Sequence, residues 1–347
     1  MPSEHPYEHH ICNLKGNDMR SKRGFVRRIL AAALVLSTVG WASNVLAQED
    51  YPNKPITLII PYAAGGGTDA VARIIAQKLG EVLKKPVVAD NRPGATGALA
   101  AHLVSRAIPD GYTLLFGSNG PMSINPVFRK SVASYDPITE FAPIAQISIS
   151  PNVIVVNPQF PARSAAEFIA LAKAKPGSIN VGTTLGSSPD IMLLLFAHRA
   201  GIDFLRVPYA SGAQSMRDVI AGHVPVMADN VTATQPYIVA NTLVPIAVGS
   251  AQRVPTLPNV SAIAETLPGF ESNSWFGVFA PAKTPRPILA KLNSAINEVL
   301  NQEDVKKRFV ALGMVGVGGS QEKLRDYLAA EIAQLNKLAK DTGLTLE

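Results

Sequence analysis

A run of three glycines at residues 65–67, followed by Thr68 and Asp69, has the residue types and spacing of a ligand-binding loop. It comes directly after a short apolar run, Ile56–Ile60, which predicts a buried strand. A helical pattern then continues to about residue 83. The unpaired backbone N–H groups of a helix N-terminus point toward one spot, and the helix dipole adds about half a positive charge there. The segment therefore predicts a seat for an anion.

The same loop matches neither common phosphate-binding fingerprint, because it lacks the lysine and spacing of a P-loop and the pattern G-x-G-x-x-G. Beyond residue 47 there is also no G-x-S-x-G nucleophile elbow. His102, His198 and His223 stand singly, without metal-ligand spacing, so we expect structural or surface roles for them. The sequence predicts no catalytic residue, no metal and no cofactor, and a hydrolase with a dispersed triad is a minor alternative.

Two further polar loops follow predicted strands, at residues 117–120 and 183–188. Ligands of open α/β sheets bind at the carboxyl ends of strands, so three such loops predict one cleft. Two acidic residues near these loops have two interpretations each. Asp69 either stabilises the first helical turn or contacts the ligand or loop amides, and Asp229 either faces the cleft or caps the next helix. Tyr62, directly before the glycines, is expected in the cleft wall.

The rest of the chain alternates short apolar strands with helical stretches, which predicts an α/β architecture with largely parallel sheets. Strands are expected at 56–60, 87–89, 113–116, 144–149, 153–156, 179–182, 224–227, 244–248 and 276–280, and helices at 68–83, 96–106, 164–174, 188–200, 211–221, 287–300, 303–312 and 321–340. Three hundred residues after the leader suggest two domains. Because no flexible linker interrupts them, we expect one domain to be inserted in the other.

Residues 1–47 have the layout of a secretory signal peptide with an N-terminal extension. Five basic residues between positions 20 and 28 precede an uncharged apolar run at 29–39, and Val45-Leu46-Ala47 forms a small-residue cleavage site. The apolar run is shorter than the roughly 20 residues of a membrane span, so an uncleaved anchor is a minor alternative. We expect export to the periplasm with cleavage near Ala47/Gln48, and Met19 as an alternative translation start to Met1.

Composition excludes a disulfide framework and gives no argument for nucleic acid. The one cysteine, Cys12, lies in the leader, so the mature chain has no disulfide, thiolate metal site or cysteine nucleophile. Removing the six basic and three acidic residues of the leader leaves 26 basic and 23 acidic residues, a net charge of +3. That balance, without a basic stripe, predicts no nucleic-acid partner.

Local motifs along nearly the whole mature chain, from about 51 to 347, resemble those of one family. They are Tyr51-Pro52-x-Lys54-Pro55-Ile56, Ile60-Pro61-Tyr62-Ala63-x-Gly65-Gly66-Gly67-Thr68-Asp69, Asn91-Arg92-Pro93-Gly94-Ala95, Pro109-Asp110-Gly111-Tyr112-Thr113-Leu114, Val207-Pro208-Tyr209, Ser274-Trp275-Phe276-Gly277 and Ala280-Pro281-Ala282. In this order the chain resembles the substrate-binding proteins of tripartite tricarboxylate transporters, the Bug or TctC-type periplasmic receptors.

The resemblance implies a type II periplasmic binding protein-like fold, with two α/β domains and a ligand cleft between them. Residues 48–150 plus 274–347 would form the first domain, and residues 151–273 the inserted second domain. The protein would be a monomer that binds a small carboxylate and closes around it. It would deliver this ligand to the membrane permease subunits of the transporter.

The resemblance also implies which residues hold the carboxylate, mainly through loop amides and hydroxyls. The candidate ligand-binding residues are Tyr62, Ala63, Gly66, Gly67, Thr68, Asp69, Ser118, Thr183, Ser187, Ser188 and Asp229. The third loop departs from the family's Asn-Gly-Ser-x-x-His run, with Gly186 and Ile191 at the asparagine and histidine positions. Asp190 adds a negative charge to this loop, which favours a monocarboxylate or a ligand with a polar or cationic far end.

Two other functions use the same features. A ligand-presenting module for a periplasmic sensor kinase needs the same cleft, and the sequence does not separate it from a transport receptor. A periplasmic hydrolase on an α/β scaffold is less favoured, because the nucleophile elbow is absent.

Overall fold

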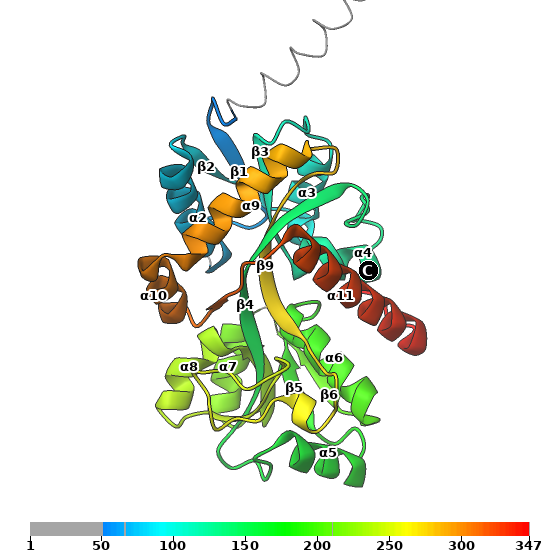
Figure 1. The fold of residues 1–347 in the computed structure, drawn as a ribbon. Coiled ribbons are helices and arrows are strands. Elements are labelled where there is room, and N and C mark those ends of the chain that lie inside the picture. The colour runs from blue at the N-terminus through cyan, green and yellow to red at the C-terminus, as the bar shows by residue number, and fades with distance from the viewer. Residues whose placement is uncertain (1–50, 66, 210, 347) are drawn as a thin grey trace, which may run out of the picture. The chain divides into compact units, whose positions relative to one another are not determined.

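The computed structural model describes residues 51–65, 67–209 and 211–346, and from Pro52 onward these form one compact unit (Figure 1). The predicted leader at 1–47 and Gly66 of the first loop lie outside the described residues. In the part that is described, no helix has both the length and the hydropathy needed to cross a bilayer.

A mixed sheet runs through the unit in the order β2-β1-β3-β9-β4-β7-β5-β6, with β8 and β10 also pairing with β4. Its strands are β1 (Ile56–Ile60), β2 (Val87–Asn91), β3 (Thr113–Ser118), β4 (Phe141–Val156), β5 (Asn180–Thr183), β6 (Leu205–Pro208), β7 (Val226–Asn230), β8 (Val244–Val248), β9 (Asn273–Pro281) and β10 (Val315–Gly316). We call β1–β3, β9, β10 and the N-terminal part of β4 the first half of the sheet. The C-terminal part of β4 with β5–β8 is the second half.

Strands β4 and β9 connect the two halves, as the long green and yellow strands of Figure 1 show. The sequence predicted two separate strands at 144–149 and 153–156, but β4 runs through both. It pairs antiparallel with β9 as far as Pro151, opposite Asn273, and then with β7 and β8. Pairs β1–β2, β1–β3, β5–β6 and β5–β7 are parallel, while every pair of β4 or β9 is antiparallel. The expectation of largely parallel sheets was therefore wrong for the connecting strands.

The helices are α2 (Gly67–Leu83), α3 (Ala98–Ser105), α4 (Asn125–Phe128), α5 (Ala165–Ala174), α6 (Ser188–Ala200), α7 (Gly212–Ile220), α8 (Val231–Val239), α9 (Arg286–Asn301), α10 (Glu303–Ala311) and α11 (Gln321–Thr342). Most follow the predicted segments to within a few residues. The Ser164 side chain caps α5 by accepting from the Glu167 N–H. In α6 the cap is Ser187, whose hydroxyl accepts from the Asp190 N–H.

Three apolar clusters form the core, and the C-terminal helix α11 contributes to two of them. Leu324 and Leu328 pack with Trp275 and other residues of the first half. Leu335 and Leu338, two turns later, pack in the cluster built around the second half. Helix α11 therefore contacts both halves of the sheet beside the connecting strands.

Candidate functional site

A cavity of about 650 Å³ opens among the C-terminal ends of several strands and receives residues from both halves of the sheet. It is lined by Tyr62, Gly67, Thr68, Thr96, Ser118, Asn119, Gly120, Ile124, Ser150, Thr184, Gly186, Ser187, Ser188, Pro189, Ser211, Gly212, Ala228, Asp229, Asn230, Thr232, Ala233, Ser274, Trp275, Phe276 and Met314. The N-termini of α2 and α6 both reach it. The strand-end loops thus converge on one cleft, as the sequence predicted.

Asp69 holds the first loop in place from behind the cavity. It is buried, and its Oδ2 accepts the backbone N–H of Gly65 at 2.9 Å. Arg73 Nε donates to both carboxylate oxygens, at 2.9 and 3.0 Å, and Asn91 Nδ2 donates to Oδ1 at 2.9 Å. The hydrogen bond from Arg73, and after it that from Gly65, lowers the pKa of Asp69 to about 2. Asp69 is therefore an ionised anchor for the loop amides and does not line the cavity.

Asp190 has the same task in the third loop. It is fully buried, accepts the Gly186 N–H at 2.9 Å and forms an ion pair with Arg206 Nη1 at 3.1 Å. It is not among the cavity-lining residues. The expectation that Asp190 repels a second carboxylate was wrong, because its charge is turned into the protein and balanced by a guanidinium from β6. Asp190 therefore gives no preference for a monocarboxylate over a dicarboxylate.

Buried Asn152 of β4 organises the floor of the cavity. Its Nδ2 donates to Ser188 Oγ at 3.0 Å and to the Ser272 carbonyl at 3.2 Å. Its Oδ1 accepts from Asn230 Nδ2 at 2.7 Å and from Ser274 Oγ at 3.2 Å. Because Ser188 accepts from an amide donor, its own hydroxyl proton is directed elsewhere, and the side chain lies in the cavity wall.

Tyr62 and Ser118 form the hydroxyl wall on the side of the first half. Tyr62 Oη lies 3.2 Å from Ser118 Oγ, and burial raises the pKa of the Tyr62 phenol. A Cβ placed on Gly120 would lie only 2.6 Å from Tyr62 Oη, so the tyrosine hydroxyl packs directly on that glycine. Tyr62 is therefore a neutral hydrogen-bonding group of the wall, as expected from its position before the glycines.

Asp229, at the end of β7, faces the cavity on the side of the second half. Its Oδ1 accepts the N–H of Asn230 at 2.7 Å, and the carboxylate packs against Gly212, where a Cβ would lie 2.0 Å from Oδ2. Burial raises its pKa. Of the two interpretations left open by the sequence, the cleft-facing one agrees with this geometry, since Asn230 occupies the cap of α8.

The structure brings seven of the eleven candidate residues to the cavity: Tyr62, Gly67, Thr68, Ser118, Ser187, Ser188 and Asp229. Ala63 is exposed on the loop, Asp69 is buried behind it, and Thr183 is buried at the end of β5, so these three lie outside the cavity lining. Gly66 is outside the described residues.

Several polar lining residues were missed by the sequence reasoning: Thr96, Thr184, Ser211, Asn230, Thr232 and Ser274. Thr184 lies inside the predicted third loop, and Ser274 belongs to a quoted motif, so these two had a local signal. Thr96 and Ser211 begin segments that were predicted as helices, and Thr232 lies in α8, which was not predicted. None of the three belongs to a motif that indicated ligand binding.

Electrostatically, the cavity offers helix N-termini and hydroxyl groups, the kinds of group that attract an anion. Among the described lining residues there is no lysine or arginine, and Asp229 is the one acidic residue. The carboxylates of Asp69 and Asp190 are each balanced by an arginine, so neither opposes an anion at the helix N-termini. Within the described part of the chain, no group of three or more His, Cys, Asp or Glu side chains fits a metal ion.

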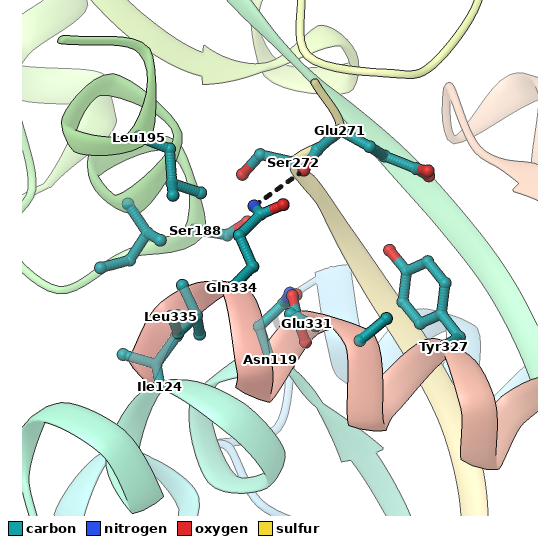
Figure 2. A pocket seen from close by; sticks show the side chains of 12 residues that line it. Asn119, Ile124, Ser188, Leu195, Glu271, Ser272, Tyr327, Glu331, Gln334 and Leu335 are labelled. Atoms are coloured by element: carbon teal, nitrogen blue, oxygen red, sulfur yellow. Dashed lines mark hydrogen bonds between the residues drawn. The ribbon is translucent and has the colours of Figure 1, made fainter. Parts of the chain in front are cut away.

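A second, smaller cavity of about 110 Å³ lies beside the first and shares Asn119, Ile124 and Ser188 with it. Figure 2 shows Glu331 of α11 next to Asn119, with Tyr327 farther along the same helix and Glu271 on the chain that faces the helix. Asn119 Nδ2 donates to Glu331 Oε1 at 2.7 Å, and Trp275 Nε1 donates to Oε2 at 2.8 Å. Burial raises the pKa of Glu331 to about 7, although the hydrogen bonds from these donors act to lower it. Glu331 thereby ties α11 to a cavity-lining residue and to β9.

The fold and the site define an α/β ligand-binding protein of the periplasmic binding protein class. The chain belongs to the tripartite tricarboxylate transporter receptor family, whose model matches residues 71–344. BugT of Bordetella pertussis is 32% identical over 324 residues, which cover 92% of this chain and 99% of BugT.

Two solved structures are similar throughout the described unit. R. palustris Rpa4515 with adipate is 35% identical, with a TM-score of 0.71, covering 85% of this chain and 99% of that one. MatC from Rhodopseudomonas palustris with bound malate is 30% identical, with a TM-score of 0.68, covering 83% and 99%. The chain is therefore similar to these two proteins over more than four fifths of its length.

Proposed function

We propose that this receptor captures a small carboxylate in the 650 Å³ cavity and delivers it to the membrane subunits of a tripartite tricarboxylate-type transporter. The observation that carries the proposal is the meeting of two helix N-termini and hydroxyls from both halves of the sheet in one cavity. Membership of a receptor family and the adipate and malate held by two similar proteins support it. These two ligands favour an aliphatic dicarboxylate as the first candidate.

The proposed site consists of the seven candidate residues in the cavity, with Asp69 and Thr183 supporting the loops and Ala63 and Gly66 completing the first one. Charge-assisted hydrogen bonds contribute about 1.5–3 kcal/mol each, and micromolar affinity requires about 8 kcal/mol. Four or five such bonds, less the costs of ordering and association, suffice. No catalytic step is needed, and the family consists of receptors.

Closure around the ligand is part of the proposal. The domains would be residues 48–150 with 274–347, and residues 151–273. The pairing of β4 and β9 supports this division, because it ends at Pro151 opposite Asn273. Two strands that cross side by side are a suitable hinge for rigid bodies. Export to the periplasm through cleavage near residue 47, and a monomeric state, belong to the same proposal.

The test is thermal unfolding of the purified protein, refolded to remove any ligand carried from the cell, with adipate, malate, citrate, glutamate and benzoate. The neutral diamide of adipate serves as its matched control. A ligand that binds only the native state stabilises it by about 2.7 kcal/mol at a hundredfold excess over Kd. We expect an upward shift with one chemical group of acids and none with the amide. Shifts with neither, or equal shifts with acid and amide, would contradict the proposal.

Two variants locate the binding. Ser188→Ala removes a hydroxyl from the cavity wall and should weaken binding about tenfold, the equivalent of about 1.4 kcal/mol. Ser178→Ala is the control, because Ser178 is exposed and its hydroxyl donates to the Lys175 carbonyl outside the cavity. An equal loss in both variants would place the ligand elsewhere.

A further inference from the structure

Four consecutive residues between β2 and α3 have left-handed backbone, and only two of them are glycine. The φ angles are 147° at Gly94, 46° at Ala95, 54° at Thr96 and 91° at Gly97. For a β-branched residue such as Thr96 this conformation is a steric outlier. Strained backbone conformations of this kind are concentrated at functional sites. We therefore expect a functional reason for the left-handed conformation of Thr96.

Packing does not supply that reason, since both Ala95 and Thr96 are exposed. The backbone is held instead by the side chain of Asn125, whose Nδ2 donates to the Ala95 carbonyl at 3.3 Å and to the Thr96 carbonyl at 3.1 Å. The two strained residues differ in one respect. Thr96 lines the 650 Å³ cavity, whereas Ala95 does not.

The hydroxyl of Thr96 has a defined direction. Arg129 Nη1 donates to Thr96 Oγ1 at 2.6 Å. A guanidinium has no acceptor, so Oγ1 is the acceptor in this bond and its proton must point to another acceptor. The bond to a charged donor also polarises the hydroxyl and strengthens it as a donor. Since Thr96 borders the cavity, that acceptor is expected there.

Arg129 is itself placed by both halves of the protein. It follows α4, and a Cβ on Gly186 of the third loop would lie 2.7 Å from its Nη2. The Thr96 carbonyl lies close to Gly120, which also touches the Tyr62 hydroxyl. Thr96 thus lies next to the hydroxyl wall formed by Tyr62 and Ser118. The guanidinium of Arg129 contacts Thr96 from outside the cavity lining.

We propose that Thr96 is a ligand-binding residue of this receptor, and that its hydroxyl donates to an unprotonated oxygen of the bound acid while Arg129 positions and polarises it. The inference rests on the proposed function and adds to it a specificity-determining residue. It predicts a ligand whose carboxylate oxygen reaches the wall formed by Tyr62, Ser118 and Thr96. The strained backbone at Thr96 serves to direct the hydroxyl into the cavity.

The experiment compares three variants by calorimetric titration with adipate, and with malate where adipate does not bind the wild type. Thr96→Gly removes both the strain and the hydroxyl, and Ala95→Gly removes the neighbouring strain alone. Thr96→Ser keeps the hydroxyl with a smaller side chain. We expect Kd to rise about tenfold in Thr96→Gly, the equivalent of one hydrogen bond, and to stay within about twofold of wild type in Ala95→Gly and Thr96→Ser.

Thermal unfolding separates this effect from a structural one. Both glycine variants relieve a left-handed Cβ, so their unfolding temperatures should lie within about 2 °C of each other while their affinities differ. Wild-type affinity in Thr96→Gly, or an equal loss in Ala95→Gly, would overturn this inference and leave the proposed function standing. Absence of acid binding by the wild type would overturn both.

Discussion

Asp69 and Asp190 make the same hydrogen bond in the two loops that border the cavity. Each is the third residue of its helix, and each accepts at 2.9 Å the backbone N–H of a glycine four residues earlier. Those glycines, Gly65 and Gly186, both have left-handed backbone, with φ of 87° and 75°. An arginine balances each carboxylate. The same local hydrogen-bonding arrangement therefore shapes both strand-to-helix loops and places both helix N-termini at the cavity.

The first prediction concerns these two anchors. Asp69→Asn and Asp190→Asn keep the shape but remove the charge that the arginine and the glycine N–H contact. We expect each variant to lose about 1–3 kcal/mol of unfolding free energy and to bind the ligand more weakly. The loss should be larger for Asp190, which is fully buried and paired with Arg206.

Urea unfolding measures the loss, with Asp326→Asn as the control. Asp326 is exposed and pairs with its neighbour Arg325, so its replacement should change stability by no more than about 0.5 kcal/mol. Equal stability of Asp69→Asn, Asp190→Asn and Asp326→Asn would contradict the role of the two buried carboxylates in holding the loops.

The Asp190 anchor also shows where sequence reasoning stops. The strand-to-helix loop and the cap near Ser187 follow from local residue types, because turns and caps are set within a few residues. The charge balance of Asp190 depends on Arg206, which β6 brings alongside β5. Strand β6 itself was missed, since two of its four residues are exposed, none is buried, and they show no apolar run.

In the rest of the fold, too, elements with a clear local pattern were predicted, and features without such a local signal were not. Strands Ile56–Ile60 and Val244–Val248 were predicted to the residue, because each is an apolar run with clear ends. Helix α8 was not predicted, because Pro236 lies inside it. The role inferred for Thr96 depends on Arg129, 33 residues later in the chain, and had no local signal.

The second prediction is a pH dependence of stability caused by Glu331. Burial raises its pKa from the ordinary value of 4.5 to about 7. The folded protein then holds a proton that the unfolded chain releases. This contribution is fully present below pH 4.5 and is lost as the pH rises through about 7. It amounts to at most about 3 kcal/mol.

Unfolding free energies of wild type and Glu331→Gln at pH 5, 6, 7 and 8 give the test. The variant should lose most of the wild-type slope, and its amide will oppose one of the two donors, Asn119 or Trp275. Glu271 and Tyr327 also face Glu331, and burial raises the pKa of both. Glu271→Gln is the comparison variant: because the Glu271 charge contributes only the smallest part of the rise in the Glu331 pKa, this variant should lose less of the slope than Glu331→Gln. A slope unchanged in Glu331→Gln would contradict the assignment.

The third prediction uses the close contact of Gly212 with Asp229. A Cβ on Gly212 would lie 2.0 Å from Asp229 Oδ2, so Gly212→Ala must push the carboxylate away from its position in the cavity wall. We expect weaker ligand binding and a loss of about 1–3 kcal/mol in stability from overpacking. Gly316→Ala is the control, since its nearest contact is Phe309 at an ordinary 3.5 Å. Unaltered affinity in Gly212→Ala would mean that the ligand does not depend on the position of Asp229.

The last prediction concerns the hydroxyl of Tyr62. Tyr62→Phe removes a hydrogen-bonding group from the cavity wall and leaves Ser118 without this neighbour at 3.2 Å, while the ring still packs beside Gly120. Affinity should fall by up to about tenfold, and stability by about 1 kcal/mol. Tyr112→Phe is matched to it, because the Tyr112 hydroxyl donates to Asn53 Oδ1 at 2.9 Å away from the cavity lining. That control should lose similar stability and keep its affinity. A common loss of affinity in both variants would show that the effect of Tyr62 is transmitted through stability and not through contact with the bound acid.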